Sequence, residues 1–157
     1  MILGVTGHRP GQLGGYSDRV FEALTGLAAK HLAIHKPEMV ITGLAMGWDM
    51  AVANAAWKLQ IPFLAYIPFE GQAEPWSIEW RTRWWMFRDC AHREKVFGGG
   101  YSDIVMKKRN EGIVDDSHEM LALFNGYPSG TKHAVDYALK QGRPLHNLWN
   151  EWNAANV

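Results

Sequence analysis

Residues 39–59 read MVITGLAMGWDMAVANAAWKL, and this stretch decides the fold. Its first four residues form an apolar run, Gly43 and Gly47 bound a short loop, and Trp48–Leu59 has the spacing of a helix. A short apolar run between turn residues is typical of a buried strand. The stretch therefore predicts a strand, a glycine-containing loop and a helix in direct succession.

The same succession recurs along the whole chain. The expected strands are Ile2–Thr6, Met39–Thr42, Phe63–Ile67, Lys95–Phe97, Met120–Phe124 and Pro144–Leu148. The expected helices are Ser17–His35, Trp48–Leu59, Ser77–Asp89, Ile104–Asp116 and Thr131–Lys140, with Ser17 as an N-cap and Gly142 as a C-cap. Strands that alternate with helices predict an α/β fold, a three-layer α/β/α sandwich with a mostly parallel sheet.

The composition is that of one globular domain over residues 1–157, since no fixed-period repeat and no Pro-, Gly- and Ser-rich linker divides the chain. The 16 Lys and Arg residues balance the 16 Asp and Glu residues. No apolar run approaches the roughly 20 residues that span a bilayer, and the N-terminus lacks the basic start of a signal peptide. Cys90 stands alone, without a C-x-x-C pair. We therefore expect a cytoplasmic protein with no membrane contact, no metal and no cofactor.

One segment departs from this neutral balance. Residues 81–109 contain eight Lys and Arg against three Asp and Glu, and they overlap a helical stripe made by the tryptophans at positions 76, 80 and 84, followed by the tryptophan at position 85. Such a stripe favours packing in the core or in a subunit interface, so Trp76–Trp85 is a candidate homo-oligomer contact. The alternative is a lid that stacks on a nucleobase.

Polar and glycine residues gather directly after the expected strands, where parallel sheets bind ligands. The first such loop holds Gly7, His8 and Arg9. Glycine lets the backbone approach a ligand, and the planar fork of Arg9 suits phosphate or carboxylate. The alternative is a plain turn with a solvated arginine.

The second loop, Thr42 to Asp49, leads from the second strand into a helix. Gly43 and Gly47 allow its amide groups to face an anion near the helix N-terminus. It is neither a Walker A loop nor a Gly-x-Gly-x-x-Gly fingerprint. Asp49 either holds a ribose hydroxyl or caps the helix.

The third loop follows the fifth strand. Small residues, a hydroxyl group, a helix N-terminus and a lysine fall within one turn, which favours a phosphate cradle over an ordinary capped connection. The candidate residues in this loop are Gly126, Ser129, Gly130, Thr131 and Lys132.

Short pieces in a fixed order over nearly the whole chain resemble a known family. They are Gly7-His8-Arg9, Ile41–Asp49, Ile67–Phe69 with Trp76, Arg109-Asn110, Ile113–Asp115, Leu121–Phe124, Ser129–Thr131 with Tyr137-Ala138, and Gly142–Pro144. With them the chain is similar to the SLOG superfamily and in particular to its YpsA/YspA-like branch. The superfamily also groups DprA (Smf) and the LOG "lysine decarboxylase-like" proteins. The resemblance implies a Rossmann-like fold and suits a bacterial or phage host.

The LOG branch implies a chemistry. LOG enzymes cleave the bond between ribose 5-phosphate and a base, and resemble this chain in an arginine before the fifth strand, here Arg109, followed by Asn110. The glutamate that assists base departure in LOG enzymes corresponds to Ala134. Glu70 and Glu111 are the weak candidates for a replacement catalytic carboxylate, since general acid or base work needs reach and a tuned pKa.

Three functions follow in order of preference. The first is binding of a nucleotide or nucleotide-derived ligand through the three loops, Arg109 and Asn110. The second is a LOG-like N-glycosidase acting on a nucleoside 5′-monophosphate. The third is DprA-like binding of single-stranded DNA through the basic, tryptophan-rich segment, which the neutral total charge disfavours.

Overall fold

The structure is a computed structural model that describes residues 1–155, and its centre is a six-stranded sheet. The strands are β1 (Ile2–Gly7), β2 (Met39–Thr42), β3 (Phe63–Phe69), β4 (Arg93–Gly98), β5 (Glu119–Leu123) and β6 (Leu145–Asn147). Their order is β4-β3-β2-β1-β5-β6, and every neighbouring pair is parallel. The predicted Rossmann-like sandwich is confirmed, and its sheet is wholly parallel within these residues.

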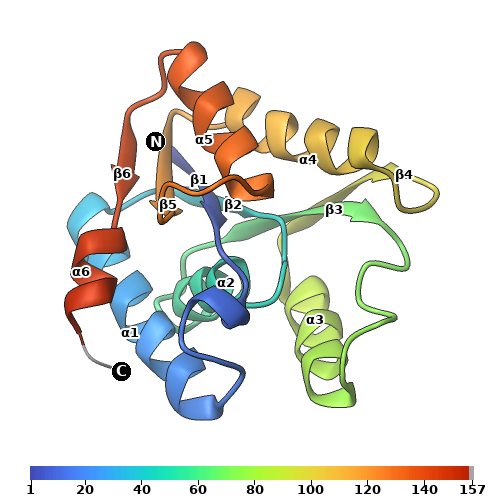
Figure 1. Ribbon diagram of the computed structural model, residues 1–157, viewed down its shortest axis with the longest axis horizontal. Helices are drawn as coiled ribbons and strands as arrows, with labels where there is room; N and C mark the ends of the chain where they lie inside the picture. Colours follow the sequence, from blue (N-terminus) through green and yellow to red (C-terminus); the bar gives the residue numbers. More distant parts are fainter. Residues whose placement is uncertain (156–157) are drawn as a thin grey trace.

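Helices cover both faces of the sheet. In Figure 1, α1 (Asp18–His35), α2 (Trp48–Lys58), α3 (Ile78–Cys90) and α6 (Trp149–Ala154) lie below it, and α4 (Asp103–Asp115) and α5 (Gly130–Lys140) lie above it. A 3-10 turn, η1 (Pro10–Gln12), follows β1. Strands β2, β3 and β4 are added on one side of β1, and β5 and β6 are added on its other side. The strands β1 and β5 therefore form the topological switch point at which such folds bind ligands.

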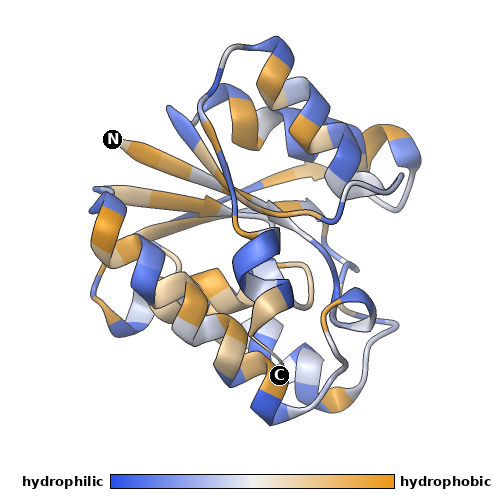
Figure 2. Ribbon diagram, turned by 60° about the vertical axis from the view of Figure 1, so that its left-hand side comes forward, coloured by the Kyte–Doolittle hydropathy of each residue, from blue (hydrophilic) through white to orange (hydrophobic). Residues whose placement is uncertain are grey.

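Two apolar layers hold the helices to the sheet. The larger one joins the sheet to α1, α2 and α3 and contains the fully buried Trp48 and Trp84. The smaller one lies under α4 and α5 around Tyr66 and Ile113. Figure 2 shows largely hydrophobic strands and helices that alternate between hydrophobic and hydrophilic turns, as expected of helices with one buried face.

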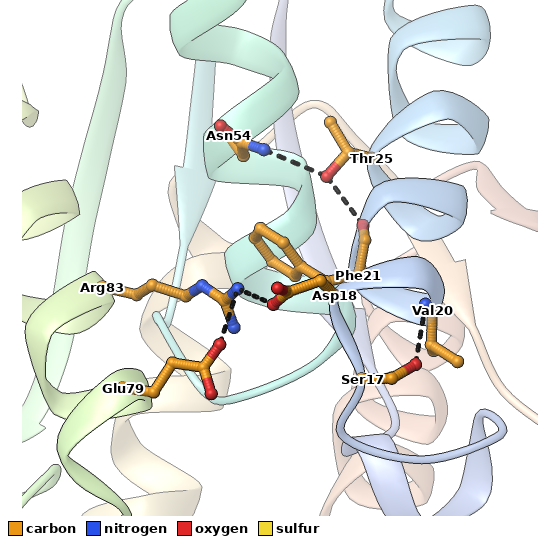
Figure 3. Close-up of polar contacts among 8 residues, drawn as sticks. All are labelled: Ser17, Asp18, Val20, Phe21, Thr25, Asn54, Glu79 and Arg83. Carbon is orange, nitrogen blue, oxygen red and sulfur yellow. Dashed lines mark hydrogen bonds and ion pairs between the residues drawn. The ribbon is translucent and has the colours of Figure 1, made fainter.

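Polar contacts fasten α1 to α2 and α3 (Figure 3). The Arg83 guanidinium lies 2.7 Å from Asp18 and 3.3 Å from Glu79, and its carbon stands 4.5 Å from the centre of the Phe21 ring. On the neighbouring pair of helices, Asn54 donates to the Thr25 hydroxyl at 3.1 Å. These contacts fix how the three helices pack.

The tryptophan stripe on α3 faces the core. Trp80 and Trp84 are only 3% and 1% exposed, the half-buried Trp76 lies just before the helix, and Trp85, which follows the stripe, is exposed. Two of the three arginines of this helix are ion-paired, Arg83 with Asp18 and Glu79 and Arg88 with Glu70 and Glu94, whereas Arg81 is exposed. Of the two alternatives for the stripe, the structure therefore supports packing within the core.

The predicted helices match the observed ones to within one residue at each end. Ser17 caps α1 by accepting a hydrogen bond from the Val20 amide, and Gly142 has a φ of 71° just after α5. The largest strand difference lies at β4, which begins at Arg93 instead of Lys95 because an edge strand has exposed polar residues that an apolar pattern does not detect. Neither η1 nor the six-residue α6 is among the elements that the sequence pattern predicts. No helix within residues 1–155 combines the length and apolar character needed to cross a bilayer.

Candidate ligand-binding site

The loops after β1, β2 and β5 surround a cavity of about 240 Å³ at the carboxyl ends of β1 and β5. Nine of the fourteen binding residues expected from the sequence line it: Gly7, His8, Arg9, Asp49, Arg109, Asn110, Ser129, Gly130 and Thr131. The lining also includes Thr6, Gln12, Ala45 and Met106, which the sequence analysis missed. Of these, Met106 stands one helical turn before Arg109, and that spacing is the signal that identifies it.

Arg109 is a buried residue of the cavity wall whose side chain binds backbone carbonyl groups. The residue is 4% exposed, and its Nη1 donates to the carbonyl of Gly43 at 2.7 Å and to that of Tyr66 at 3.3 Å. Its Nε donates to the Asn110 side chain at 3.0 Å. Burial lowers the pKa of the guanidinium, which the Asp49 carboxylate opposes, and arginine stays protonated near neutral pH. Arg109 therefore fixes the β2 loop as well as placing positive charge at the cavity.

Thr42, Gly43 and Gly47 shape the β2 loop without lining the cavity. A Cβ on Gly43 would lie 2.6 Å from the Arg109 Cζ, so only glycine fits against this guanidinium. Gly47 has a φ of 93° and packs on the His8 carbonyl, where a Cβ would lie at 2.7 Å. The Thr42 hydroxyl donates to the Asp49 carbonyl at 2.9 Å and joins the strand end to α2. These residues set the wall behind the ligand position.

Asp49 brings a buried carboxyl to the cavity from the first turn of α2. Its side chain is 6% exposed, and its Oδ1 has no hydrogen-bond partner among residues 1–155. Burial raises the pKa of Asp49 to about 6, against the opposing effects of Arg109, the Ala45 amide and Arg9. An unpartnered buried acceptor is rare, and it marks a place where a ligand donor can bind.

His8 ties the first loop to the third. Its Nε2 accepts a hydrogen bond from the Asn125 amide at 2.9 Å, which requires an unprotonated Nε2. Burial also lowers the pKa of His8. His8 is therefore a neutral connector, and the exposed Arg9 beside it is the side chain of this loop that reaches into open space.

The N-terminus of α5 lines the cavity through Ser129, Gly130 and Thr131. Ser129 caps the helix by accepting from the Lys132 amide at 3.2 Å, and Asn110 donates to the Gly130 carbonyl at 3.4 Å. The free amide groups and the dipole of a helix N-terminus favour an anion. Lys132 lies outside the lining and pairs with Asp136 at 2.6 Å, and Gly126 lies outside it too.

Comparison with known proteins places the chain in a family. No protein-family profile matches it. It is 32% identical to the uncharacterized SPbeta prophage-derived protein YoqJ of Bacillus subtilis (strain 168), over 69% of this chain and 73% of YoqJ. The chain belongs to the YoqJ family. The bacterial or phage host that the resemblance suits agrees with this relative, a prophage-derived protein of a bacterium.

Solved structures relate the YoqJ family to other proteins at the level of the fold. DprA of Streptococcus pneumoniae has a TM-score of 0.63 at 18% identity over 91% of this chain, which spans about half, 48%, of that DprA chain. DprA of Helicobacter pylori, described for its single-stranded DNA binding mode, has a TM-score of 0.64 at 15% identity over 98% of this chain and 72% of its own. The molybdenum cofactor binding protein of Rippkaea orientalis has a TM-score of 0.60 at 20% identity, over 99% and 82%. These relatives share the fold expected from the SLOG resemblance.

The two weak catalytic candidates lie outside the cavity lining. Glu70 follows β3 and accepts from Arg88 at 2.7 Å, and Glu111 on α4 lies 3.2 Å from His133. Asp49 is the carboxylate that does line the cavity. Any acid or base work inside the cavity would therefore fall to Asp49 before either glutamate.

Proposed function

We propose that the protein binds a nucleotide or nucleotide-derived ligand in the cavity between the β1 and β5 loops. The observation that carries the proposal is the presence of complementary groups in one small cavity. Arg9 and the α5 N-terminus offer positive charge, and the partly protonated Asp49 offers an unpartnered acceptor. A nucleotide carries the matching groups, a phosphate and donor hydroxyls, on one molecule.

The cavity size narrows the ligand class. Its volume of about 240 Å³ is slightly below the roughly 300–1,000 Å³ of common small-ligand pockets. A mononucleotide with part of its surface in solvent suits this space better than a dinucleotide. Solved proteins of this fold include carriers of the molybdenum cofactor and a single-stranded DNA-binding DprA, so the fold serves several ligand types.

A thermal-shift screen tests the proposal directly. Nucleoside mono-, di- and triphosphates, NAD, ADP-ribose and cyclic dinucleotides are compared at equal concentration. A ligand at about 100 times its dissociation constant adds roughly 2.7 kcal/mol to the folded state, which raises the midpoint by several degrees. We expect one nucleotide class to give the shift and inorganic phosphate to give a smaller one.

Two arginine variants separate site binding from general charge. We expect Arg9→Ala to lose most of the ligand-induced shift while its midpoint without ligand stays unchanged, because Arg9 is exposed. The matched control is Arg81→Ala, which removes an exposed arginine on α3. A full shift in Arg9→Ala, or no shift with any nucleotide in the wild-type protein, contradicts the proposal.

A second candidate function, cleavage of a nucleotide N-glycosidic bond, is favoured by Asp49 alone. A carboxyl in a cavity with a pKa of about 6 suits general acid or base catalysis near neutral pH. The test is chromatographic detection of free base after long incubation with each nucleoside 5′-monophosphate. Base release that disappears in Asp49→Asn supports this function, and no release from any nucleotide removes it.

The DNA alternative has less support from the residues. Helix α3 offers one exposed indole, Trp85, in place of a row, and two of its three arginines, Arg83 and Arg88, are engaged in ion pairs. We therefore expect a fluorescent oligonucleotide to show no anisotropy change even at low salt, where phosphate contacts are strongest.

A further inference from the structure

Three potential metal ligands meet at the end of the sheet opposite the cavity. His35 is the last residue of α1, Glu119 is the first residue of β5, and His146 is the middle residue of β6. One ligand atom from each residue lies within 4.8 Å of the other two. The rings of His35 and His146 have centroids 4.3 Å apart.

The cluster has unused coordinating capacity. His146 Nε2 lies 2.8 Å from Glu119 Oε1, so these two groups already share a proton or an ion pair. The half-buried His35 ring stands beside them and forms no hydrogen bond with a residue from 1 to 155. A salt bridge explains the contact between His146 and Glu119, but it does not explain why the His35 ring lies beside them.

Two residues near His35 on α1, Lys30 and His31, have ionic partners of their own. His31, one turn earlier on α1, stacks on His35 with a centroid separation of 6.3 Å. His31 itself lies 2.8 Å from Glu151, which also pairs with Lys30 at 2.7 Å. The ion pairs of α1 with α6 therefore engage Lys30 and His31, whereas the His35 ring stands beside Glu119 and His146.

We propose that His35, Glu119 and His146 bind one divalent transition-metal ion, with Zn²⁺ as the best match. Two imidazoles and one carboxylate form a ligand set that zinc uses, whereas Mg²⁺ and Ca²⁺ prefer all-oxygen sites. Bonds of about 2.0–2.2 Å place tetrahedral ligand atoms roughly 3.3–3.5 Å apart, so small side-chain rotations bring these groups into place. The partial exposure of all three residues leaves the fourth position to water.

Binding exchanges one hydrogen bond for two metal bonds. Neutral His146 with its proton on Nδ1 offers the Nε2 lone pair to the metal, and Glu119 Oε1, which otherwise shares a hydrogen bond with Nε2, binds the same ion. The ion then joins α1, β5 and β6. Because β6 is a three-residue edge strand, such a link ties the shortest strand of the sheet to α1 and β5.

The test is zinc titration of the full chain, without a polyhistidine tag, monitored by calorimetry and by competition with a chromophoric chelator. Cys90 is exposed and is replaced in every sample by Cys90→Ser so that its thiol does not compete. We expect one Zn²⁺ per chain, a raised unfolding midpoint, and a Co²⁺ absorption spectrum of tetrahedral type. Mg²⁺ should not compete.

Ligand variants decide between this site and adventitious binding. His35→Ala, which loses no hydrogen bond, and His146→Ala should each weaken zinc binding about tenfold or more. The control His92→Ala removes an exposed histidine elsewhere and should change nothing. Unfolding curves without metal establish that each variant is folded. Absence of binding, unchanged affinity in His35→Ala, or an equal loss in His92→Ala overturns the proposal.

Discussion

Asp49 shows at the scale of one residue how the fold sets chemistry. The sequence left it between a helix cap and a ribose-binding carboxylate, and either role is compatible with its place at the start of a helix. The structure buries it beside Arg109, and burial has the larger effect, so the pKa of Asp49 rises to about 6. The group is thus partly protonated near neutral pH and able to act as donor or acceptor.

The raised pKa predicts a pH-dependent stability difference. A carboxyl whose pKa is higher in the folded protein favours folding below its unfolded pKa of about 3.9, and this contribution is lost as pH rises through about 6. Relative to Asp49→Asn, the wild-type protein should therefore lose about 2 kcal/mol between pH 4 and pH 7. Urea unfolding of both proteins across this range measures it. Parallel pH profiles would show that Asp49 is not buried as described.

Substitution of Gly43 tests how closely the β2 loop packs against Arg109. Gly43→Ala should destabilise the protein by about 1–3 kcal/mol, because the added methyl overlaps a guanidinium held by two carbonyls. Gly26→Ala is the control, since Gly26 lies on the exposed side of α1 with open space around it. That change should stabilise by about 0.5–1 kcal/mol. A neutral Gly43→Ala would mean that Arg109 moves freely.

At the scale of elements, three helix N-termini have the same capping hydrogen bond but different surroundings. Ser17, Ser102 and Ser129 each accept a hydrogen bond from the backbone amide three residues on. The α5 N-terminus lines the cavity, whereas those of α1 and α4 do not. A cap is a local feature that sequence predicts well, but the element it faces depends on the order of the strands.

A pair of cap variants separates stability from binding. Ser129→Ala and Ser17→Ala should each cost about 1 kcal/mol of unfolding free energy, because each loses one side-chain acceptor. Only Ser129→Ala should also weaken the nucleotide-induced thermal shift. If both variants keep the full shift, the α5 N-terminus does not hold the ligand, and the phosphate position must be reassigned to Arg9 alone.

At the scale of the whole molecule, a chain of hydrogen bonds links the α3 layer to the candidate site. Trp84 Nε1 donates to Gln72 Oε1 at 2.9 Å, and Gln72 Nε2 donates to the Gly43 carbonyl at 3.1 Å. The same carbonyl accepts from Arg109 on the opposite helix layer. One backbone carbonyl therefore connects both faces of the sheet at the cavity wall.

Removing the middle of this chain should affect fold and site together. Gln72→Leu should destabilise by about 1–3 kcal/mol because it leaves the Trp84 N–H buried without a partner. In a double-mutant cycle with Trp84→Phe, the double variant should lose less stability than the sum of the two single-variant losses. The reason is that Trp84→Phe removes the same N–H donor that Gln72→Leu leaves without a partner. Strict additivity, measured by urea unfolding, would show that the bond carries no energy.

The sequence by itself determined the layout of the protein. The apolar runs, the helical spacing and the Ser17 cap predicted five helices to within one residue, and the positions of the loops after β1, β2 and β5 indicated where these loops would meet. These signals are local, because strand and helix periods and cap hydrogen bonds involve residues close in the chain.

Only the tertiary structure decided how individual side chains are used. In the folded protein Arg109 is buried and binds the Gly43 carbonyl, and Lys132 pairs with Asp136. Trp80 and Trp84 lie in the core, and His35 lies close to Glu119 and His146. Each of these outcomes depends on packing between elements far apart in sequence. Burial, charge pairing and coordination are properties of that packing, and no local period encodes them.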